Sequence, residues 1–418
     1  MEQTLTLDGM RWPRIISFVS GIGMMAASFL TIRHFFLANY PENIFEGSFC
    51  DISAFFNCDS SAFATIAQVV GIPIGYFGLI VGALVALGAV FPSESFERTN
   101  TFIAFLNVVG VVVLIVYSVF ILGSLCFLCT GFYMFAILSF ILFWRFGVGR
   151  GQDNFLKRYF RPSLKILVTS FCIAALGAYG VIQYHQVRKD AQAAVALRIV
   201  KQFRELPVVG NPSFISPYWT VRSTEYFEDA PIQVIEYADF LCPDCVFLTQ
   251  QLDKLKEEFA GKINIVFQFY PLDGQCNTVV GKDFHPGACE LSYIAAYDPA
   301  RFLEIHDEIF ANFNDARKPE WRQELARRYG VEEALNDPVT QDFIQAIIFT
   351  GTEYAQTSDR YTAGIRSTPT MIINGRMVIG TLPYEHMRAI FKDLVDEYEG
   401  REEFIEHWVP PKARKIKR

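Results

Sequence analysis

The sequence predicts a fold of two parts, in which a bundle of five membrane-spanning helices precedes a water-soluble α/β domain. Of the 418 residues, 51% are hydrophobic and only 19% are charged, which is more apolar than an ordinary soluble chain. Apolar runs of about the length needed to cross a bilayer recur through the first half of the chain. In the second half, strand-like and helix-like runs alternate, which is typical of an α/β layer.

The five predicted spans cover residues 15–32, 71–91, 101–122, 126–144 and 166–184. The first run has the character of a signal peptide, but no small-residue cleavage pattern follows it and further spans do. We therefore interpret it as a membrane helix. Pro73 falls in the first turn of the second span, where the missing N–H costs least.

The distribution of basic residues orients the predicted spans. The loop at 145–165 carries six Arg and Lys residues. By the positive-inside rule this loop, the N-terminal tail and the polar turn at 93–100 lie in the cytoplasm. Five spans then place the loop at 37–70 and the whole soluble half on the outer side of the membrane.

The cysteines are unusually numerous and fall into pairs. Eight of the nine form four close pairs, which are Cys50/Cys58, Cys126/Cys129, Cys242/Cys245 and Cys276/Cys289. The predicted topology puts all four pairs on the outer side, and pairing at this density indicates an oxidising compartment or thiol chemistry. The ninth, Cys172, lies in an apolar run, where we expect a small buried residue with no redox role.

Two other classes of partner are disfavoured by the sequence. Zinc is the rival interpretation of two CxxC pairs, but one pair has apolar surroundings and neither has a histidine nearby, so we expect no metal. The net charge of −7 argues against nucleic acid. The basic tail at 401–418 is expected to be solvated.

The soluble half contains the tetrapeptide Cys-Pro-Asp-Cys at 242–245, between a strand predicted at 233–237 and a helix predicted at 246–259. At a helix N-terminus the helix dipole and the free N–H groups favour a thiolate, so the pKa of Cys242 should be low. Asp244 should oppose that thiolate and make the pair a weaker oxidant.

Two further residues fit the chemistry of this dithiol. Glu236 lies on the incoming strand, six residues before Cys242, and is placed to reach Cys245 as a proton acceptor. Pro369 immediately precedes a strand, which is a suitable place for a cis proline beside the disulfide.

The rest of the soluble half supplies the remaining elements of an α/β domain. An amphipathic helix at 186–205 and a linker at 207–217 come first, and a second strand is predicted at 263–270. A mostly helical insert follows at 287–362. Strands at 370–373 and 377–380 are joined by Asn374-Gly375, a strong hairpin signal, and a last helix runs from Pro383 to about residue 397.

This half resembles the thioredoxin fold, and within it the DsbA-like disulfide oxidoreductases with a helical insert. The resemblance covers about 210–400 and is carried by three separated elements in the right order. These are Glu236, the run Phe240-Leu241-Cys242-Pro243-Asp244-Cys245 and the run Ser367-Thr368-Pro369-Thr370.

The membrane half resembles the vitamin K epoxide reductase family. The matching features are the loop pair Cys50 and Cys58, the run Gly71-Ile72-Pro73 and the run Cys126-Phe127-Leu128-Cys129 that opens the fourth span. The resemblance implies a four-helix catalytic bundle within 1–147. A bacterial branch of that family continues through a fifth helix, here within 148–209, into a thioredoxin-like domain, here 210–400.

The family resemblance also implies roles for individual residues. The loop pair would relay electrons to the membrane pair, and Cys129 would face a quinone, with ubiquinone, menaquinone, plastoquinone and phylloquinone not distinguished. Tyr133 lies one helical turn after Cys129 and would contact that quinone. The sequence departs from the family at Ala64, where a Ser or Thr is usual, and at Ile74, where vertebrate members have Asn.

The second pair of the soluble half, Cys276 and Cys289, also fits the fusion branch, which carries an added pair there. The sequence agrees with two roles for this pair, which are a static structural disulfide and a further step of the electron relay.

Taken together, the sequence predicts a thiol oxidase of a bacterial inner membrane or a thylakoid-type membrane. Reduced or unfolded secreted proteins would give electrons to the thioredoxin-like domain on the periplasmic or lumenal side, and the membrane quinone pool would receive them. The alternatives are a transmembrane reductant exporter, a vitamin K epoxide or quinone reductase, and a membrane-tethered thiol chaperone. An exporter needs a cytoplasmic thiol, and no cysteine lies in the predicted cytoplasmic segments.

Overall fold

The computed structural model describes residues 11–41, 44, 58–91, 93–122, 124–146, 161–280 and 283–401. Cys50 and most of the predicted basic tail lie outside these residues. The chain divides into two compact units, one formed by Met1–Asn39 with Phe55–Lys189 and the other by Tyr40–Ala54 with Asp190–Arg418.

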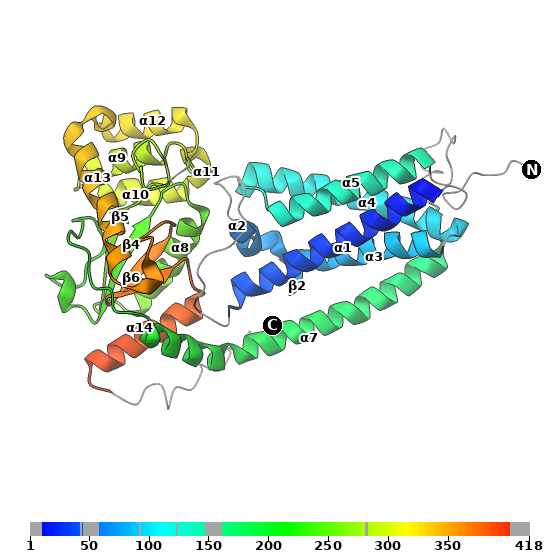
Figure 1. Ribbon diagram of the computed structural model, residues 1–418, viewed down its shortest axis with the longest axis horizontal. Coiled ribbons are helices and arrows are strands. Elements are labelled where there is room, and N and C mark those ends of the chain that lie inside the picture. The colour runs from blue at the N-terminus through cyan, green and yellow to red at the C-terminus, as the bar shows by residue number, and fades with distance from the viewer. Residues whose placement is uncertain are drawn as a thin grey trace, which may run out of the picture. The chain divides into compact units, whose positions relative to one another are not determined.

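The first unit is a bundle of long apolar helices (Figure 1). Its helices are α1 (Arg11–Asn39), α3 (Ile74–Val90), α4 (Glu94–Tyr117) and α5 (Phe127–Phe146), with the short α2 (Cys58–Phe63) and the π-helical turn η3 (Ser118–Leu122). The turn η2 (Thr65–Ala67) and the antiparallel strands β1 (Gln68–Val69) and β2 (Ile72–Pro73) connect α2 to α3. α1 packs along both α3 and α5, so it lies at the centre of the bundle.

Within the described residues, four helices are long and apolar enough to cross a membrane. They cover Trp12–Asn39, Glu94–Leu122, Phe127–Phe146 and Leu164–Val187, and the apolar helix Ile74–Val90 is shorter, with 17 residues. The predicted apolar helices are all present, and the pattern is that of a multi-pass membrane protein.

Two sequence-based boundaries were wrong. Residues 93–100 are not a polar turn, because α4 already begins at Glu94, and the Ser93 hydroxyl caps it by accepting a hydrogen bond from the Phe96 N–H. The fifth span and the amphipathic helix after it form one continuous helix, α7 (Leu164–Glu205). No proline or glycine occurs between residues 181 and 205, so nothing ends the helix there.

The second unit contains a five-stranded sheet within the described residues, in the order β3-β5-β4-β6-β7. Its strands are β3 (Trp219–Val221), β4 (Ile232–Ala238), β5 (Ile263–Phe269), β6 (Thr370–Ile373) and β7 (Arg376–Ile379). β4 and β5 are parallel and the other neighbours are antiparallel. The predicted hairpin joins β6 to β7 through Asn374 and Gly375, both at positive φ. Sequence analysis missed β3, which has only three residues.

Helices cover both faces of this sheet (Figure 1). The elements are α8 (Pro243–Glu258), α9 (Ala288–Tyr297), α10 (Phe302–Ala311), α11 (Phe313–Ala316), α12 (Pro319–Tyr329), α13 (Pro338–Glu353) and α14 (Tyr384–Tyr398), with the turns η4 (Phe227–Asp229), η5 (Glu332–Asn336), η6 (Tyr354–Gln356) and η7 (Asp359–Tyr361). α9 to α13 form the predicted helical insert. The strand and helix pattern is that of the thioredoxin-like α/β domain expected from the sequence.

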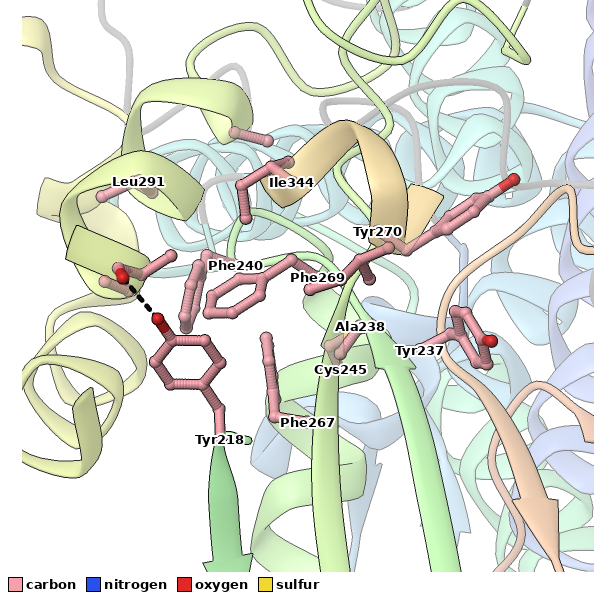
Figure 2. Packing of buried hydrophobic residues seen from close by; sticks show 14 of the residues in the cluster. Tyr218, Tyr237, Ala238, Phe240, Cys245, Phe267, Phe269, Tyr270, Leu291 and Ile344 are labelled. Atoms are coloured by element: carbon pink, nitrogen blue, oxygen red, sulfur yellow. Dashed lines mark hydrogen bonds between the residues drawn. The ribbon is translucent and has the colours of Figure 1, made fainter. Parts of the chain in front are cut away.

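Alternate residues of β4 divide the hydrophobic core in two. Val234 packs with apolar side chains of α8 and α14, whereas Ile235 and Tyr237 pack with side chains of α9, α10 and α13. The second cluster is strongly aromatic, with Phe240 stacked on Phe267 at a centroid distance of 5.1 Å (Figure 2). The dithiol Cys242/Cys245 belongs to this cluster, so the reactive sulfurs lie at the edge of a rigid core.

Close packing of α1 against α3 depends on glycines. A Cβ atom on Gly82 would lie 2.8 Å from the carbonyl oxygen of Gly21 and 2.9 Å from the backbone nitrogen of Met25. Helix backbones approach this closely only where no side chain intervenes, as in other membrane helix pairs.

Gly82→Ala should therefore destabilise the bundle by about 1–3 kcal/mol, the usual cost of forcing an extra methyl group into a packed contact. Gly180→Ala is the matched control, because a Cβ there meets no atom within 4 Å. Thermal melting of the detergent-solubilised variants should show a lower midpoint for Gly82→Ala alone. Equal midpoints would mean that helices α1 and α3 can move apart to admit the methyl group without loss of stability.

Candidate dithiol sites

The membrane dithiol lies at the N-terminus of α5. Cys126 immediately precedes the helix and Cys129 lies in its first turn, and both are free thiols. The backbone N–H of Cys129 donates to Cys126 Sγ over 3.3 Å. Unpaired N–H groups and the positive end of the helix dipole favour negative charge here, so the local structure suits a thiolate on Cys126.

Cys126 is also in contact with the loop pair. Its Sγ lies 3.5 Å from the Sγ of Cys58, the first residue of α2, and Cys58 is itself in a disulfide. Thiol–disulfide exchange begins with the approach of a thiolate to one sulfur of a disulfide. These two sulfurs need only a small further approach, so the structure brings together the predicted donor and acceptor of the relay.

Cys129 opens into a cavity of about 400 Å³ between the bundle helices. Tyr133 lies one turn further along α5 and lines the same cavity, as the sequence predicted for a shared helix face. Most of the remaining walls are apolar, and Ala64 and Ile74, the two departures from the family pattern, are among them. The size and lining are those of a site for a small, largely apolar molecule.

Sequence analysis missed several polar residues of this cavity, among them Asn107 on α4. Its amide nitrogen lies 3.9 Å from the sulfur of Met24. An amide in the middle of an apolar span is expensive in lipid and marks a functional position, so the sequence held a signal for it.

The soluble dithiol begins helix α8. Cys242 is the N-cap residue and Pro243 occupies the first helical position, where its fixed φ suits the helix. The Cys242 thiol donates to the carbonyl oxygen of Thr368 over 3.3 Å, and the Thr368–Pro369 peptide bond is cis. The predicted cis proline therefore lies beside the dithiol, as expected.

The two thiols of this pair differ in their acidity. Burial alone would raise the pKa of Cys242, but the Cys245 thiol hydrogen bond and the charge of His285 lower it to about 7. Burial and the neighbouring Cys242 raise the pKa of Cys245 well above its ordinary value. Cys242 is thus the more acidic thiol of the pair.

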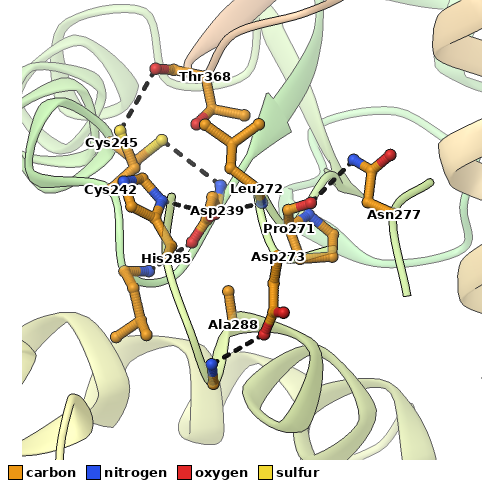
Figure 3. A network of polar contacts seen from close by, with 12 residues as sticks. Asp239, Cys242, Cys245, Pro271, Leu272, Asp273, Asn277, His285, Ala288 and Thr368 are labelled. Carbon is orange, nitrogen blue, oxygen red and sulfur yellow. Dashed lines mark hydrogen bonds and ion pairs between the residues drawn. The ribbon is translucent and has the colours of Figure 1, made fainter. Parts of the chain in front are cut away.

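A buried carboxylate connects this dithiol to two other segments (Figure 3). The Asp239 carboxylate accepts hydrogen bonds of 2.6 Å from the N–H groups of Leu241 and Leu272, and it lies 2.7 Å from His285 Nδ1. The N–H of Asp239 donates to Cys245 Sγ over 3.5 Å. Asp239 is 1% exposed and His285 5%, so the pair is shielded from solvent.

The segment that carries His285 is closed by a disulfide. Cys276 and Cys289 are bonded, at a sequence separation of 13. Asp273 fixes the end of the segment by accepting hydrogen bonds from the N–H groups of Gly287, at 2.8 Å, and Cys289, at 3.4 Å (Figure 3). This geometry agrees with the interpretation of the pair as a static structural disulfide.

Glu236 occupies a different position from the one expected. It lines a cavity of about 20 Å³ with Thr249, one turn after Cys245 on α8, and with His306 of α10. Oε1 of Glu236 is buried without a hydrogen-bond partner in the described part of the chain. Burial, with a smaller effect from the Asp253 charge, raises the pKa of Glu236 to about 8. It makes no hydrogen bond to Cys245, although the cavity is large enough for one water.

The remaining cysteine is placed differently from the sequence-based expectation. Cys172 is an exposed free thiol on α7, not a buried one. The apolar stretch of α7 touches the bundle through the Tyr76 hydroxyl, which donates to the Ala174 carbonyl oxygen, but none of it is buried. An apolar run of this kind indicates a surface for lipid.

Sequence analysis also missed Asp239, His285 and Asp273. The position of Asp239, directly after an apolar strand and three residues before Cys242, is a signal in the sequence. A carboxylate buried there would be costly without partners, so it points to a polar contact. Nothing in the sequence links His285 to Cys242, because the contact depends on the path of the loop between β5 and α9.

Two family models match the chain. Residues 14–144 match the vitamin K epoxide reductase family, and residues 227–393 match the thioredoxin family. The boundaries follow the membrane unit and the sheet-containing unit.

Relatives of known name match parts of the chain. A probable disulfide bond formation protein D of Bacillus cereus is 35% identical over 88 residues, which is 20% of this chain and 38% of that protein. Disulfide bond formation protein D of Bacillus subtilis is 24% identical over 181 residues, 40% of this chain and 74% of that protein. A Na⁺/H⁺ antiporter NhaA 1 of Mycolicibacterium gilvum is 25% identical over 151 residues, 35% of this chain but 22% of the antiporter.

The matches thus cover well under two thirds of the length of the Bacillus cereus protein and of the antiporter. The fusion that the sequence predicted is confirmed by the two family matches. The protein joins a region of the vitamin K epoxide reductase family, at 14–144, to a thioredoxin-like region, at 227–393.

Proposed function

We propose that the protein is a membrane thiol oxidase that drives disulfide-bond formation by passing electrons from substrate dithiols to a quinone. The observation that carries the proposal is the 3.5 Å approach of Cys126 Sγ to the disulfide-bonded Cys58, with Cys129 of the same pair facing a cavity. One dithiol thus contacts both a protein disulfide and a space for a small molecule.

The relay consists of balanced thiol–disulfide exchanges. A substrate thiolate attacks the Cys242–Cys245 disulfide, and the second substrate thiol releases the mixed disulfide, which leaves an oxidised substrate and a Cys242/Cys245 dithiol. That dithiol reduces Cys50–Cys58, and the loop dithiol reduces Cys126–Cys129. Each exchange forms one sulfur–sulfur bond, breaks one, and moves two electrons and two protons.

The cavity beside Cys129 fits a quinone ring. Its volume of about 400 Å³ lies in the usual range for small-ligand sites. Tyr133 and Asn107 supply polar groups that could hydrogen bond to carbonyl oxygens, in walls that are otherwise mostly apolar. A quinone accepts two electrons and two protons, which is what the Cys126/Cys129 dithiol releases when its disulfide re-forms.

Glu236 supports the proton balance at the soluble dithiol. Cys245 loses a proton when it attacks the mixed disulfide between Cys242 and the loop pair. A side chain with a pKa of about 8 exchanges protons near neutral pH, and the ionised fraction of Glu236 can accept this one. The small cavity lined by Glu236 and Thr249 can hold a water that passes the proton.

The proposed orientation follows from charge. The loop at 145–165 is basic, which favours a cytoplasmic location, and an odd number of spans then puts the thioredoxin-like region on the periplasmic or lumenal side. The partners are therefore reduced or unfolded secreted proteins and the quinone pool of the membrane.

The decisive experiment is quinone reduction by the purified protein with a reduced, unfolded dithiol protein as donor. We expect a loss of quinone absorbance together with disulfide formation in the donor. Net reduction of donor disulfides by a quinol under the same conditions would reverse the assigned direction.

Cys129→Ala should abolish turnover with quinone, because it removes the thiol that faces the cavity. Cys242/Cys245 should still oxidise one equivalent of substrate, measured by a single-turnover thiol assay. Cys172→Ala, on the outside of α7, is the control and should retain activity. Sustained quinone reduction by Cys129→Ala would show that electrons leave by another route.

Cys245→Ser should trap a mixed disulfide between Cys242 and Cys50, because Cys242 is the more acidic thiol and its resolving partner is gone. Mass spectrometry of the digested protein should detect that peptide pair. Cys242→Ser should trap none. A dominant bond from Cys242 to Cys126 would remove the loop pair from the relay.

Glu236→Gln should stabilise the thioredoxin-like unit as pH rises. The folded pKa of about 8 exceeds the ordinary 4.5, so the wild type loses stability between these values while a neutral Gln does not. The gain should grow from about pH 4.5 to pH 8, reach up to about 5 kcal/mol, and then level off. Thermal midpoints from pH 5 to 9 measure it, with the exposed Glu225→Gln as control. A gain that is independent of pH would contradict the assigned pKa.

A further inference from the structure

The tetrapeptide that carries the soluble dithiol lacks a cation of its own. Asp244 lies between the two cysteines, and an acid at that position should oppose a thiolate on Cys242. The helix dipole alone contributes a modest effect. A group outside the tetrapeptide is therefore needed to make Cys242 acidic.

His285 lies where such a group is required. It comes from the loop between β5 and α9, and Figure 3 shows its ring beside Cys242. The two groups act on each other's charge, since His285 favours the thiolate and Cys242 favours the imidazolium. A cation beside the thiolate in a shielded site is worth more than the same pair in water.

Asp239 gives the imidazole its orientation and its charge. An ionised carboxylate only accepts hydrogen bonds, so the contact of 2.7 Å means that His285 Nδ1 carries a proton. The second ring nitrogen is then the one whose protonation makes the ring cationic. Burial alone would lower the pKa of His285, but the charge and hydrogen bond of Asp239, together with Cys242, raise it above its ordinary value.

The backbone around the pair prevents the ring from turning away. The N–H of His285 donates to the Leu272 carbonyl oxygen over 3.0 Å, and the Leu272 N–H donates to the same Asp239 carboxylate. The other charged groups that act on this site are Cys245 and Arg317, and Arg317 opposes the imidazolium. The charge of Asp239 itself raises the pKa of Cys242, so His285 must outweigh it. Among these groups, only His285 combines a carboxylate anchor with attraction for the Cys242 thiolate.

We propose that His285, held by Asp239, is the positioning residue that stabilises the Cys242 thiolate and thereby sets the oxidising power of the Cys242/Cys245 pair. Stabilising the thiolate stabilises the reduced form, which makes the disulfide a stronger oxidant. Cys242, His285 and Asp239 thus form a chain of thiolate, imidazolium and carboxylate. The inference rests on the proposed thiol–disulfide chemistry, but not on a quinone or on the direction of electron flow.

The test uses the full-length protein in detergent. The pH dependence of Cys242 alkylation by iodoacetamide, read from its peptide by mass spectrometry, gives the thiolate fraction. Equilibration with glutathione buffers, read from the same peptide, gives the redox potential. His285→Asn removes the charge and keeps a donor for Asp239, whereas His285→Ala removes both.

Both variants should lower the thiolate fraction of Cys242 near neutral pH by about tenfold. The equilibrium should shift about tenfold toward the disulfide, which for a two-electron couple is about 30 mV toward a more reducing potential. A merely structural role for His285 predicts a change in His285→Ala but not in His285→Asn. Wild-type behaviour of His285→Asn in both readouts overturns the proposal.

Two control variants separate this role from others. His386→Asn alters another buried histidine, which lies on α14 and has no part in either dithiol site, and it should leave both readouts unchanged. Arg317→Met removes the other nearby cation and should have a smaller effect than His285→Asn. If Arg317→Met changes both readouts tenfold and His285→Asn changes neither, Arg317 is the residue that stabilises the Cys242 thiolate, and the proposal is overturned. Failure of wild-type Cys242/Cys245 to equilibrate with glutathione overturns both this inference and the proposed function.

Discussion

The thioredoxin-like unit depends on one buried carboxylate, Asp239. Its two oxygens join the turn before α8, the segment after β5 and His285, which are far apart in sequence. A carboxylate without such partners would be too costly to bury, so the three segments must come together for the unit to fold. The same contacts hold His285 beside the sulfur of Cys242. The hydrogen bonds of Asp239 therefore serve both the folding of the unit and the reactivity of its dithiol.

The membrane unit favours a thiolate on its first cysteine by different means. Beside Cys126, the free N–H groups at the start of α5 take the place of a cation on a loop. The glycines of α1 and α3 bring those helices close together, while α1 also packs against α5. Both dithiols thus lie at helix N-termini, and the second cysteine of the membrane pair, Cys129, lines the cavity.

Sequence alone gave most of the architecture, because long apolar runs and the Asn374-Gly375 hairpin are strong local signals. The cysteine spacing similarly led to the reactive pairs. Helix continuity at α7 was misjudged, since a change from apolar to amphipathic composition does not end a helix. β3 was missed because three residues carry too little periodicity to be recognised.

The electrostatics of the dithiol could not be predicted, for a specific physical reason. Local sequence around Cys242 offers only Asp244, and a prediction from that residue points to a weak oxidant. The compensating charge comes from His285, 43 positions later, and reaches Cys242 only because a loop closed by Cys276 and Cys289 folds back onto Asp239. Acidity of a buried thiol is a sum over nearby charges in space. Two chains with the same tetrapeptide can therefore differ in oxidising power when their loops deliver different residues to the sulfur.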